Sequence, residues 1–363
     1  MSKLADKLIE RMNSKNVSKL GDKNAFTDKT VFASTGSPEL EANLGSFGFI
    51  KGLTEIAGAS KSGKTTLMLT AMASHQKRYP EGIRIILSSE ERDNKLYAAN
   101  IGVDVDEVII IKSIFLENLF YELQNHIDEI SELWVEEKLP GRPKIFVGWD
   151  SVGSTNSRAE LETFKENSLA HKKAMEKGQS SGAIKFSKIA DFAKTARSCM
   201  KAILAQLYSS EIIFIMLNHT YDVMGSTTGA QKSTGGSWIE YLPHTRLFCT
   251  RIGWESIDDE QVGQYTKIRI EKNDHGSRRS TTIELLLGMG IVLSKEDIEY
   301  AIDKGILKKE GAKKISFMGD KLKWVSKREF YANYKNKNKF LPILYAQITK
   351  ARHNDVLAEK GLL

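Results

Sequence analysis

The sequence has little of what secreted and membrane-embedded proteins depend on. Its 363 residues include two cysteines, Cys199 and Cys249, and nothing near them has metal-ligand spacing. This argues against a disulfide framework and against a zinc site. No apolar run approaches the roughly 20 residues that cross a bilayer, and the first residues form a charged amphipathic pattern without the apolar core of a signal peptide. These absences predict a cytoplasmic protein with no membrane partner.

Acidic residues are too few to balance the basic ones. The net charge is +7, and residues 289–363 hold 16 Lys and Arg against 9 Asp and Glu, a difference of +7, so this last fifth accounts for the whole excess. A basic region attracts anionic polymers such as nucleic acids. The same composition is also that of a solvated surface that binds nothing. Charge alone therefore leaves both interpretations open.

Short apolar runs alternate with helix-compatible stretches through the middle of the chain. Such runs are typical of strands buried on both faces, and their alternation with helices predicts an α/β core with a mostly parallel central sheet. A smaller lysine-rich unit follows, with helices expected near 295–305 and 340–352. The expected strands are 53–58, 83–89, 107–111, 144–150, 211–217, 245–252 and 266–272, and the expected helices between them are 64–79, 92–101, 116–134 and 186–208.

The stretch GASKSGKTT fits the pattern G-x-x-x-x-G-K-[ST] without a mismatch. A strand, a glycine-rich loop and a helix start in this order present backbone N–H groups and partial positive charge to phosphates. The lysine is expected to reach the β- and γ-phosphates, and the threonine after it to ligate Mg²⁺. The residues predicted to bind ATP with Mg²⁺ are Gly58, Ala59, Ser60, Lys61, Ser62, Gly63, Lys64, Thr65 and Thr66.

Two further strand ends carry carboxylates. Asp150 closes the run KIFVGWD, where it is expected to complete the magnesium site, although an Asp in this position is also a common turn residue. Glu90 and Glu91 follow the run at 83–89, at the correct edge of the sheet to orient or deprotonate water. From the sequence alone the choice between these two glutamates stays open, and either is also a plausible solvated helix-start residue.

At this point the residues resemble the RecA family of homologous-recombination ATPases, and the likeness extends over most of the chain. It is carried by TGSPELEANLGSFGFIKGLTEIAGASKSGKTTL at 35–67, SEERDNKLYAANIGVD at 89–104, WDS at 149–151 and GILKKEGAKKISFMGDKL at 305–322. The register implies that Glu90 is the catalytic glutamate and that Tyr97 stacks on adenine. The resemblance also implies an oligomerisation arm at 1–34, a RecA-like P-loop ATPase core at 35–288 and a small α+β, basic C-terminal domain at 289–363.

NHTYDVMGSTTGAQKSTGGSW, residues 218–238, resembles the second DNA-binding loop of the family. Eleven of the 19 residues at 220–238 are Gly, Ser or Thr, a flexible composition in a loop too long for a simple connector. A disordered solvent loop is the alternative. The resemblance and the loop chemistry together predict DNA contacts at Lys232, Ser233, Thr234, Gly235 and Gly236.

His219, at the root of this loop, stands where bacterial members of the family carry the glutamine that senses the γ-phosphate. The sequence Asn-His-Thr instead resembles the UvsX branch, the recombinases of tailed phages. His219 is therefore expected to contact the nucleotide and to transmit its state to the loop. A histidine at a strand end is also often structural.

The segment at 153–190 is the counterpart of the first DNA loop, but it is longer than the family pattern. Its centre, HKKAMEKGQSSGAIKFSK at 171–188, holds five lysines and two glycines. We expect an enlarged, mobile segment that faces DNA. A surface insertion of unknown use is the alternative.

In the family, a neighbouring subunit sends two basic residues into the ATP site, where they stabilise charge on the γ-phosphate. Lys272 matches the first of them, which adds it to Glu90 and Lys64 as a catalytic candidate. The second position is Asp274, a departure. Either His275, Arg278 or Arg279 takes its place, or turnover is less tightly coupled to assembly.

The function implied is an ATPase, dependent on DNA, ATP and Mg²⁺, that forms helical homo-oligomeric filaments on single-stranded DNA and exchanges strands with homologous duplex. It would act in the cytoplasm of a bacterial or phage-infected cell, with single-strand-binding and mediator proteins as possible partners. Two alternatives stay open. One is an ATP-switched DNA-coating filament or regulator without strand exchange, and the other is a hexameric RecA-like helicase.

Overall fold

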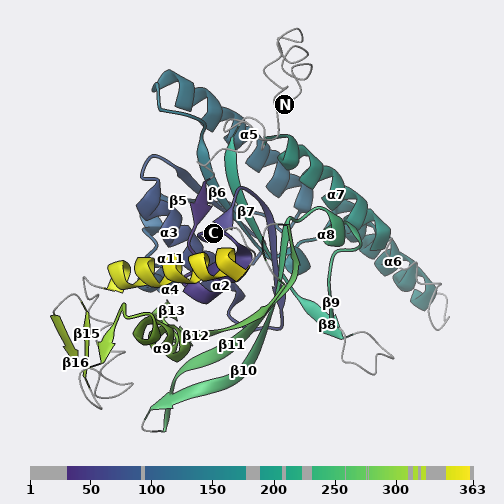
Figure 1. The fold of residues 1–363 in the computed structure, drawn as a ribbon. Helices are drawn as coiled ribbons and strands as arrows, with labels where there is room; N and C mark the ends of the chain where they lie inside the picture. The colour runs from purple at the N-terminus through teal and green to yellow at the C-terminus, as the bar shows by residue number, and fades with distance from the viewer. Residues whose placement is uncertain are drawn as a thin grey trace, which may run out of the picture.

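The structure is a computed structural model in which helices flank one large sheet (Figure 1). It describes residues 31–90, 95–176, 189–206, 210–222, 231–257, 259–274, 276, 278–309, 314–317, 320–323 and 341–359. The helices in these ranges are α2 (Pro38–Leu44), α3 (Lys64–Arg78), α4 (Lys95–Ile101), α5 (Leu116–Glu136), α6 (Arg158–Glu176), α7 (Ile189–Gln206), α8 (Trp238–Tyr241), α9 (Lys295–Asp303) and α11 (Leu341–Glu359), with short 3-10 helices η1 (Val105–Glu107) and η2 (Val152–Ser154).

The strands of the described residues form one large sheet and three small ones. They are β1 (Phe32–Ala33), β2 (Phe49–Ile50), β3 (Gly52–Gly58), β4 (Ile83–Ser88), β5 (Val108–Lys112), β6 (Lys144–Asp150), β7 (Glu211–Asn218), β8 (Thr220–Asp222), β9 (Gln231–Ser233), β10 (Thr245–Ile257), β11 (Glu260–Asn273), β12 (Ser280–Leu286), β13 (Gly290–Val292), β14 (Lys308–Lys309), β15 (Lys314–Phe317) and β16 (Asp320–Lys323). The large sheet has the order β13-β12-β11-β10-β3-β7-β6-β4-β5.

Six neighbouring strands of this sheet, from β10 to β5, run parallel. The remaining three, β11, β12 and β13, extend the sheet in antiparallel fashion. The α/β fold with a mostly parallel central sheet is therefore confirmed. Because the parallel strands point the same way, the residues that follow β3, β4, β6 and β7 all lie at one edge of the sheet.

Alternate residues of the central strand β7 face two separate cores. Ile213, Ile215 and Leu217 pack with the apolar residues of α3 on one face. Ile212, Phe214 and Met216 pack with α5 and α7 on the other. Burial on both faces explains why this strand reads as a continuous apolar run rather than as an alternating one. Among the described helices, none is long and apolar enough to cross a bilayer.

The segment at 153–190 differs from the expected loop. Residues Arg158–Glu176 form the long helix α6, which lies beside α7 in Figure 1. The helix start is stabilised by reciprocal contacts, since the Glu160 carboxylate accepts from the Ser157 backbone N–H at 2.9 Å and the Glu160 N–H donates to Ser157 Oγ at 3.4 Å. This is the capping pattern Ser-x-x-Glu, a helix-start signal that the expectation of a mobile loop did not take into account. Residues 177–188 lie outside the described residues.

The described part of the lysine-rich unit packs against α2 through α11. Leu344 and Ile348 of α11 share a core with Ile298 and Ala301 of α9. Glu41 of α2 lies beneath the helix and is 1% exposed. Its Oε1 accepts hydrogen bonds from Tyr345 Oη at 2.7 Å, Ser34 Oγ at 2.6 Å and the Thr35 N–H at 2.8 Å. These bonds join the two ends of the described chain.

The buried carboxyl of Glu41 makes the stability of this contact depend on pH. Burial raises the pKa of Glu41 from 4.5 to about 7, although the hydrogen bonds oppose the rise. Between these two pH values the folded protein keeps a proton that the unfolded chain releases. The contribution of Glu41 to the free energy of unfolding is therefore complete below pH 4.5 and is lost as the pH rises to about 7.

Glu41→Gln should remove this dependence while keeping an oxygen that accepts the same bonds. We expect its free energy of unfolding, relative to the wild type, to rise by up to about 3 kcal/mol between pH 5 and pH 8. Urea unfolding at several pH values measures the difference. Glu299→Gln, at an exposed carboxylate of α9, is the control and should show no such trend. A flat difference for Glu41→Gln would contradict the buried, protonated carboxyl.

Candidate nucleotide site and adjoining loop

The glycine-rich loop between β3 and α3 forms a tight cradle. Gly63 begins the helix with φ +91°, a conformation that favours glycine, and a Cβ there would lie 2.5 Å from Leu285 Cδ1. A Cβ on Gly58 would lie 2.3 Å from the Cys249 carbonyl oxygen. Gly58 is therefore required by space, and Gly63 chiefly by its backbone conformation.

Lys64 turns its ammonium group back over this loop. Its Nζ donates to the carbonyl oxygens of Gly58 at 2.8 Å and Ala59 at 2.7 Å. Burial lowers the pKa of Lys64, and Asp150 and Glu90 are among the groups that oppose this change. The loop thus holds a partly desolvated positive charge at the start of a helix, an arrangement suited to phosphate.

Two residues that sequence reasoning missed support the loop from outside. Gln264 Nε2 of β11 donates to the Lys61 carbonyl at 3.2 Å, and Thr266 Oγ1 donates to the Ser62 carbonyl at 3.3 Å. These residues lie about 200 positions downstream of the loop, so only the sheet register brings them there. No local pattern in the sequence would have indicated them.

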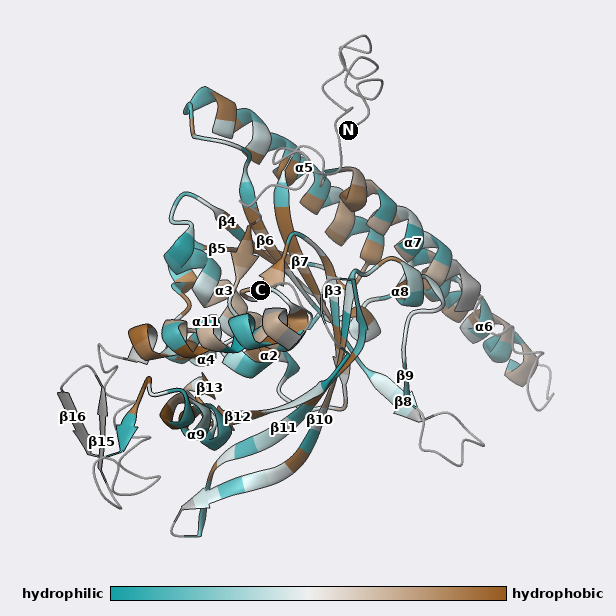
Figure 2. Ribbon diagram, viewed as in Figure 1, coloured by the Kyte–Doolittle hydropathy of each residue, from teal (hydrophilic) through white to brown (hydrophobic). Residues whose placement is uncertain are grey.

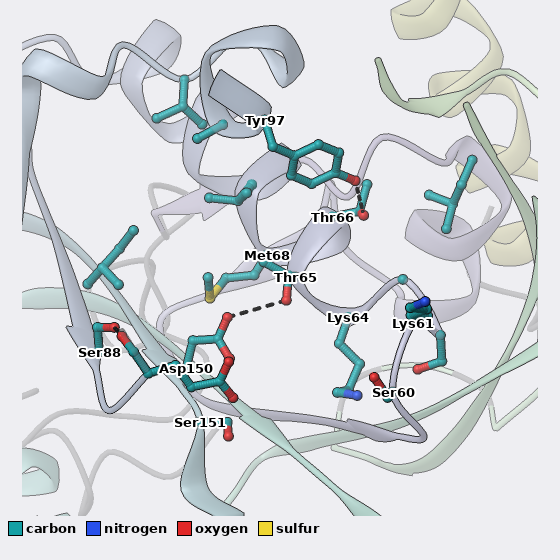
Figure 3. A pocket seen from close by; sticks show the side chains of 18 of the residues that line it. Ser60, Lys61, Lys64, Thr65, Thr66, Met68, Ser88, Tyr97, Asp150 and Ser151 are labelled. Atoms are coloured by element: carbon teal, nitrogen blue, oxygen red, sulfur yellow. Dashed lines mark hydrogen bonds between the residues drawn. The ribbon is translucent and has the colours of Figure 1, made fainter. Parts of the chain in front are cut away.

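Asp150 and Thr65 meet at the edge of the sheet (Figure 3). Thr65 Oγ1 donates to Asp150 Oδ2 at 3.3 Å. Burial raises the pKa of Asp150 to about 6, and the nearby charge of Glu90 adds to the rise, whereas Thr65 and Lys64 oppose it. A hydroxyl and a carboxylate oxygen side by side fit Mg²⁺, which prefers hard oxygen ligands.

Figure 3 also shows Tyr97 above α3, where its hydroxyl is hydrogen-bonded to Thr66 Oγ1. Burial raises the pKa of Tyr97. A cavity of about 580 Å³ is lined by this tyrosine together with Ser60, Lys61, Ser62, Gly63, Lys64, Thr65, Thr66, Glu90, Asp150 and His219, among other residues. The fold thus brings to one cavity most of the residues assigned to ATP, and their individual roles stay predictions.

The described residues of the second loop include a pair of short strands, which we call the hairpin. Strands β8 and β9 pair antiparallel, with Thr220 opposite Ser233 and Tyr221 opposite Lys232. Residues 223–230 lie outside the described residues. Gly235 and Gly236 follow with φ +107° and +93°, and a Cβ on Gly235 would lie 2.7 Å from Ile239 Cδ1. These glycines allow the chain to turn tightly against α8.

His219 connects the cavity with this hairpin. Its carbonyl accepts from the Thr234 N–H at 3.1 Å, and its own N–H donates to Asn218 Oδ1 at 2.9 Å. Burial lowers the pKa of His219, as does the charge of Lys64. The same residue therefore lines the cavity and bonds the Thr-Gly-Gly stretch.

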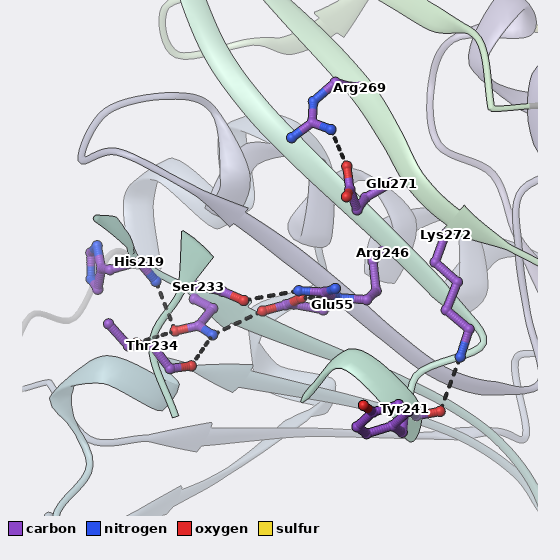
Figure 4. A network of polar contacts seen from close by, with 10 residues as sticks. Glu55, His219, Ser233, Thr234, Tyr241, Arg246, Arg269, Glu271 and Lys272 are labelled. Carbon is purple, nitrogen blue, oxygen red and sulfur yellow. Dashed lines mark hydrogen bonds and ion pairs between the residues drawn. The ribbon is translucent and has the colours of Figure 1, made fainter. Parts of the chain in front are cut away.

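A buried polar network lies under that root (Figure 4). Arg246 Nε donates to Glu55 Oε2 at 2.7 Å, and its Nη2 donates to Ser233 Oγ at 3.0 Å. Asn218 Nδ2 donates to Glu55 Oε1 at 2.9 Å, while Thr234 Oγ1 donates to Asn218 Oδ1 at 2.6 Å. Glu55 is fully buried within β3, the strand that leads into the phosphate loop. The network therefore joins that strand to the hairpin.

The expected trans-acting cation is placed away from the cavity of its own chain. Lys272 Nζ donates to the Tyr241 carbonyl at 3.0 Å, as Figure 4 shows, and this lysine is not among the described residues that line the cavity. Asp274, Arg278 and Arg279 lie in or near the turn after β11. His275 lies outside the described residues, so the identity of the second cation stays open.

Comparisons with known proteins agree with this geometry. Residues 2–118 match the RecA N-terminal domain family. The chain is 29% identical over 313 residues to a RecA protein of Chlorobaculum parvum, covering 85% of this chain and 80% of that protein. It is 28% identical over 318 residues to those of Teredinibacter turnerae and Acinetobacter baylyi, covering 86% of this chain and 82% and 81% of theirs. The chain is thus similar to RecA proteins over most of its length, and its α/β fold with a mostly parallel sheet fits a RecA-like core.

Breaking the ion pair between Arg246 and Glu55 should lower the free energy of unfolding by a measurable amount. Arg246→Met should lower the free energy of unfolding by about 3–5 kcal/mol, because it leaves the Glu55 charge buried without its partner. The double variant Glu55→Gln with Arg246→Met should be less destabilised, since the glutamine is neutral and still accepts from Asn218. Urea unfolding curves test both.

Arg269→Met provides the matched control. Arg269 pairs with Glu271 on the exposed face of β11, where both side chains are more than a third exposed. Its loss should cost about 1 kcal/mol or less. Equal destabilisation of Arg246→Met and the double variant would contradict a charged, buried pair.

Proposed function

We propose that the protein is an ATP-dependent recombination protein of the RecA type, which assembles on single-stranded DNA and exchanges strands with a homologous duplex. The observation that carries this proposal is the shared edge of the sheet. The phosphate loop after β3, Glu90 after β4, Asp150 at the end of β6 and His219 after β7 line one cavity. The similarity to RecA proteins supports the same conclusion.

In this proposal ATP and Mg²⁺ bind in the cavity. Lys64 supplies positive charge to the phosphates, and Thr65 and Asp150 supply oxygen ligands to the metal, which neutralises phosphate charge when bound. Glu90, which is exposed at the end of β4, orients the attacking water or accepts its proton. Tyr97 offers its ring to the adenine base.

The DNA contacts follow from the hairpin next to His219. Single-stranded DNA binds along Lys232, Ser233, Thr234, Gly235 and Gly236, mainly through its phosphates, so that affinity falls steeply with salt. A filament of identical subunits places ATP between protomers, with Lys272 of one chain near the γ-phosphate held by the next. Single-strand-binding and mediator proteins are expected partners of such a filament, and its setting is the cytoplasm.

Two residues bear on finer alternatives. His219, between Asn218 and Thr220, favours the UvsX branch and hence a phage setting. Asp274, where a second cation is expected, favours a filament that coats DNA and regulates recombination without exchanging strands. These are separate proposals. A strand-exchange assay decides whether the protein is a regulator that only coats DNA.

Lys64→Ala should abolish nucleotide-dependent assembly on DNA, because it removes the charge that the loop presents to phosphate. Fluorescent-nucleotide anisotropy measures the loss of nucleotide binding, and light scattering with single-stranded DNA measures the loss of assembly. The control is Lys77→Ala, at an exposed lysine in the last turn of the same helix, which should behave like the wild type. Wild-type ATP hydrolysis by Lys64→Ala would remove Lys64 from the site.

Strand exchange separates the recombinase from the regulator. Circular single strands mixed with homologous linear duplex, the protein, ATP and Mg²⁺ should give joint molecules. A heterologous duplex should give none. Regular filaments without joint molecules would favour the regulator, and closed hexameric rings that unwind a forked duplex would favour a helicase.

A further inference from the structure

The turn that follows Asp150 contacts more of the site than its sequence suggests. This turn includes Ser151 and η2, and it precedes the helix α6. Its neighbours across space come from the ends of β4 and β7 as well as from the hairpin root.

The hydroxyls of Ser151, Ser154 and Ser89 form a chain of hydrogen bonds that returns to the Ser151 carbonyl. Ser154 Oγ lies 2.7 Å from Ser89 Oγ and 2.8 Å from Ser151 Oγ, and Ser89 Oγ lies 3.1 Å from the Ser151 carbonyl oxygen. Each hydroxyl has one proton to donate. All three bonds form together when Ser151 donates to Ser154, Ser154 to Ser89, and Ser89 to the Ser151 carbonyl. Ser89 Oγ also accepts from the Ser151 N–H at 3.2 Å.

This set joins the two carboxylate-bearing strand ends. Ser89 immediately precedes Glu90 at the end of β4, and Ser151 immediately follows Asp150 at the end of β6. Ser154 contributes the hydroxyl that bridges them. The relative placement of the two carboxylates is therefore linked to a residue that carries no charge and does not line the cavity.

The turn itself is held by other contacts, so Ser154 is not needed to close it. Thr155 Oγ1 donates to the Ser151 carbonyl at 2.8 Å, and Trp149 Nε1 donates to Thr155 Oγ1 at 3.1 Å. The Trp149 ring is fully buried against Phe120, with centroids 5.0 Å apart. The Ser89 N–H donates to the Asp150 carbonyl at 3.1 Å, and Ser89 Oγ bonds the backbone of Ser151 directly. What Ser154 adds is a further side-chain bond, which ties η2 to the end of β4.

The neighbouring glycine brings the same turn against the second loop. A Cβ on Gly153 would lie 3.0 Å from His219 Cδ2 and 3.4 Å from Thr234 Oγ1. Little room therefore exists between η2 and the His219 ring. A shift of η2 would move Ser154, which bonds the end of β4, and would also change the contacts of the His219 ring.

We propose that Ser154 is a positioning residue for ATP hydrolysis, which sets Glu90 relative to Asp150 by bonding the end of β4 to the turn after β6. This inference rests on the proposed function of the same cavity. It predicts that loss of the Ser154 hydroxyl impairs the chemical step and spares nucleotide binding, because Ser154 touches neither the phosphate loop nor the cavity.

The link can be measured first in the nucleotide-free protein. Amide hydrogen exchange should quicken at least about fivefold in the peptide spanning 86–90 when Ser154→Ala is compared with the wild type. Ser89→Ala should do the same to the peptide spanning 151–156. Ser131→Ala is the control, since Ser131 is also partly buried and bonds a backbone carbonyl at 2.8 Å and another serine, Ser210, at 3.4 Å.

Kinetics with saturating single-stranded DNA supply the second readout. Ser154→Ala should lower kcat for ATP hydrolysis about tenfold and leave KM within about twofold. Ser89→Ala should lower kcat at least as much, because Ser89 also bonds the backbone of Ser151. The double variant should be no worse than Ser89→Ala alone, because that variant already breaks the bond to Ser154. If Ser154→Ala does not fold, Ser89→Ala tests the same bond from its other end.

The two proposals fail in different ways. Unchanged exchange at 86–90 in Ser154→Ala, or wild-type kcat in an active protein, would overturn the role of Ser154. Losses that simply add in the double variant would do the same. A wild-type protein that does not hydrolyse ATP would instead overturn the proposed function, while the exchange data would still decide whether Ser154 ties the two strand ends together.

Discussion

The space allowed to two glycines is the constraint on which the rest of the site depends. Gly58 passes against the Cys249 carbonyl and Gly63 against Leu285, so the loop between them is closed tightly over the start of α3. In this shape Lys64 lies back over the loop carbonyls, and Thr65 reaches Asp150. A larger side chain at either glycine would displace the loop, and the lysine, the threonine and the helix start would move with it.

The parallel sheet then determines what else can reach the loop. Because β3, β4, β6 and β7 are neighbours that point the same way, the residues after them share one edge. Two sets of contacts connect the cavity edge with the hairpin root. One is the hydrogen bond between the His219 and Thr234 backbones, and the other runs from Glu55 through Arg246 to Ser233. If nucleotide and DNA bind as proposed, this arrangement gives them a common support, which coupling between two sites requires.

The sequence reveals those features whose chemistry is local. The phosphate loop fits within nine residues, and the apolar runs report strands buried on both faces, so both are predictable. The helix α6 was missed because the prediction rested on the lysines and glycines at 171–188 and left out the capping pair Ser157 and Glu160. Glu55 is a charge within the apolar run at 53–58, but its partner lies 191 positions away. Gln264, Thr266 and Ser154 have no such signal, since their contacts depend on strand register and on the path of a turn.

The central claim is that a triphosphate bound to the loop of one copy faces Lys272 of the next copy, and that this contact controls the affinity for DNA. The most direct test is an electron cryo-microscopy structure of the protein on single-stranded DNA with a non-hydrolysable ATP analogue. The account predicts helical filaments, with nucleotide density between Lys64 of one copy and Lys272 of its neighbour, and with DNA along 232–236. Nucleotide enclosed within a single copy, far from any junction between subunits, would contradict it.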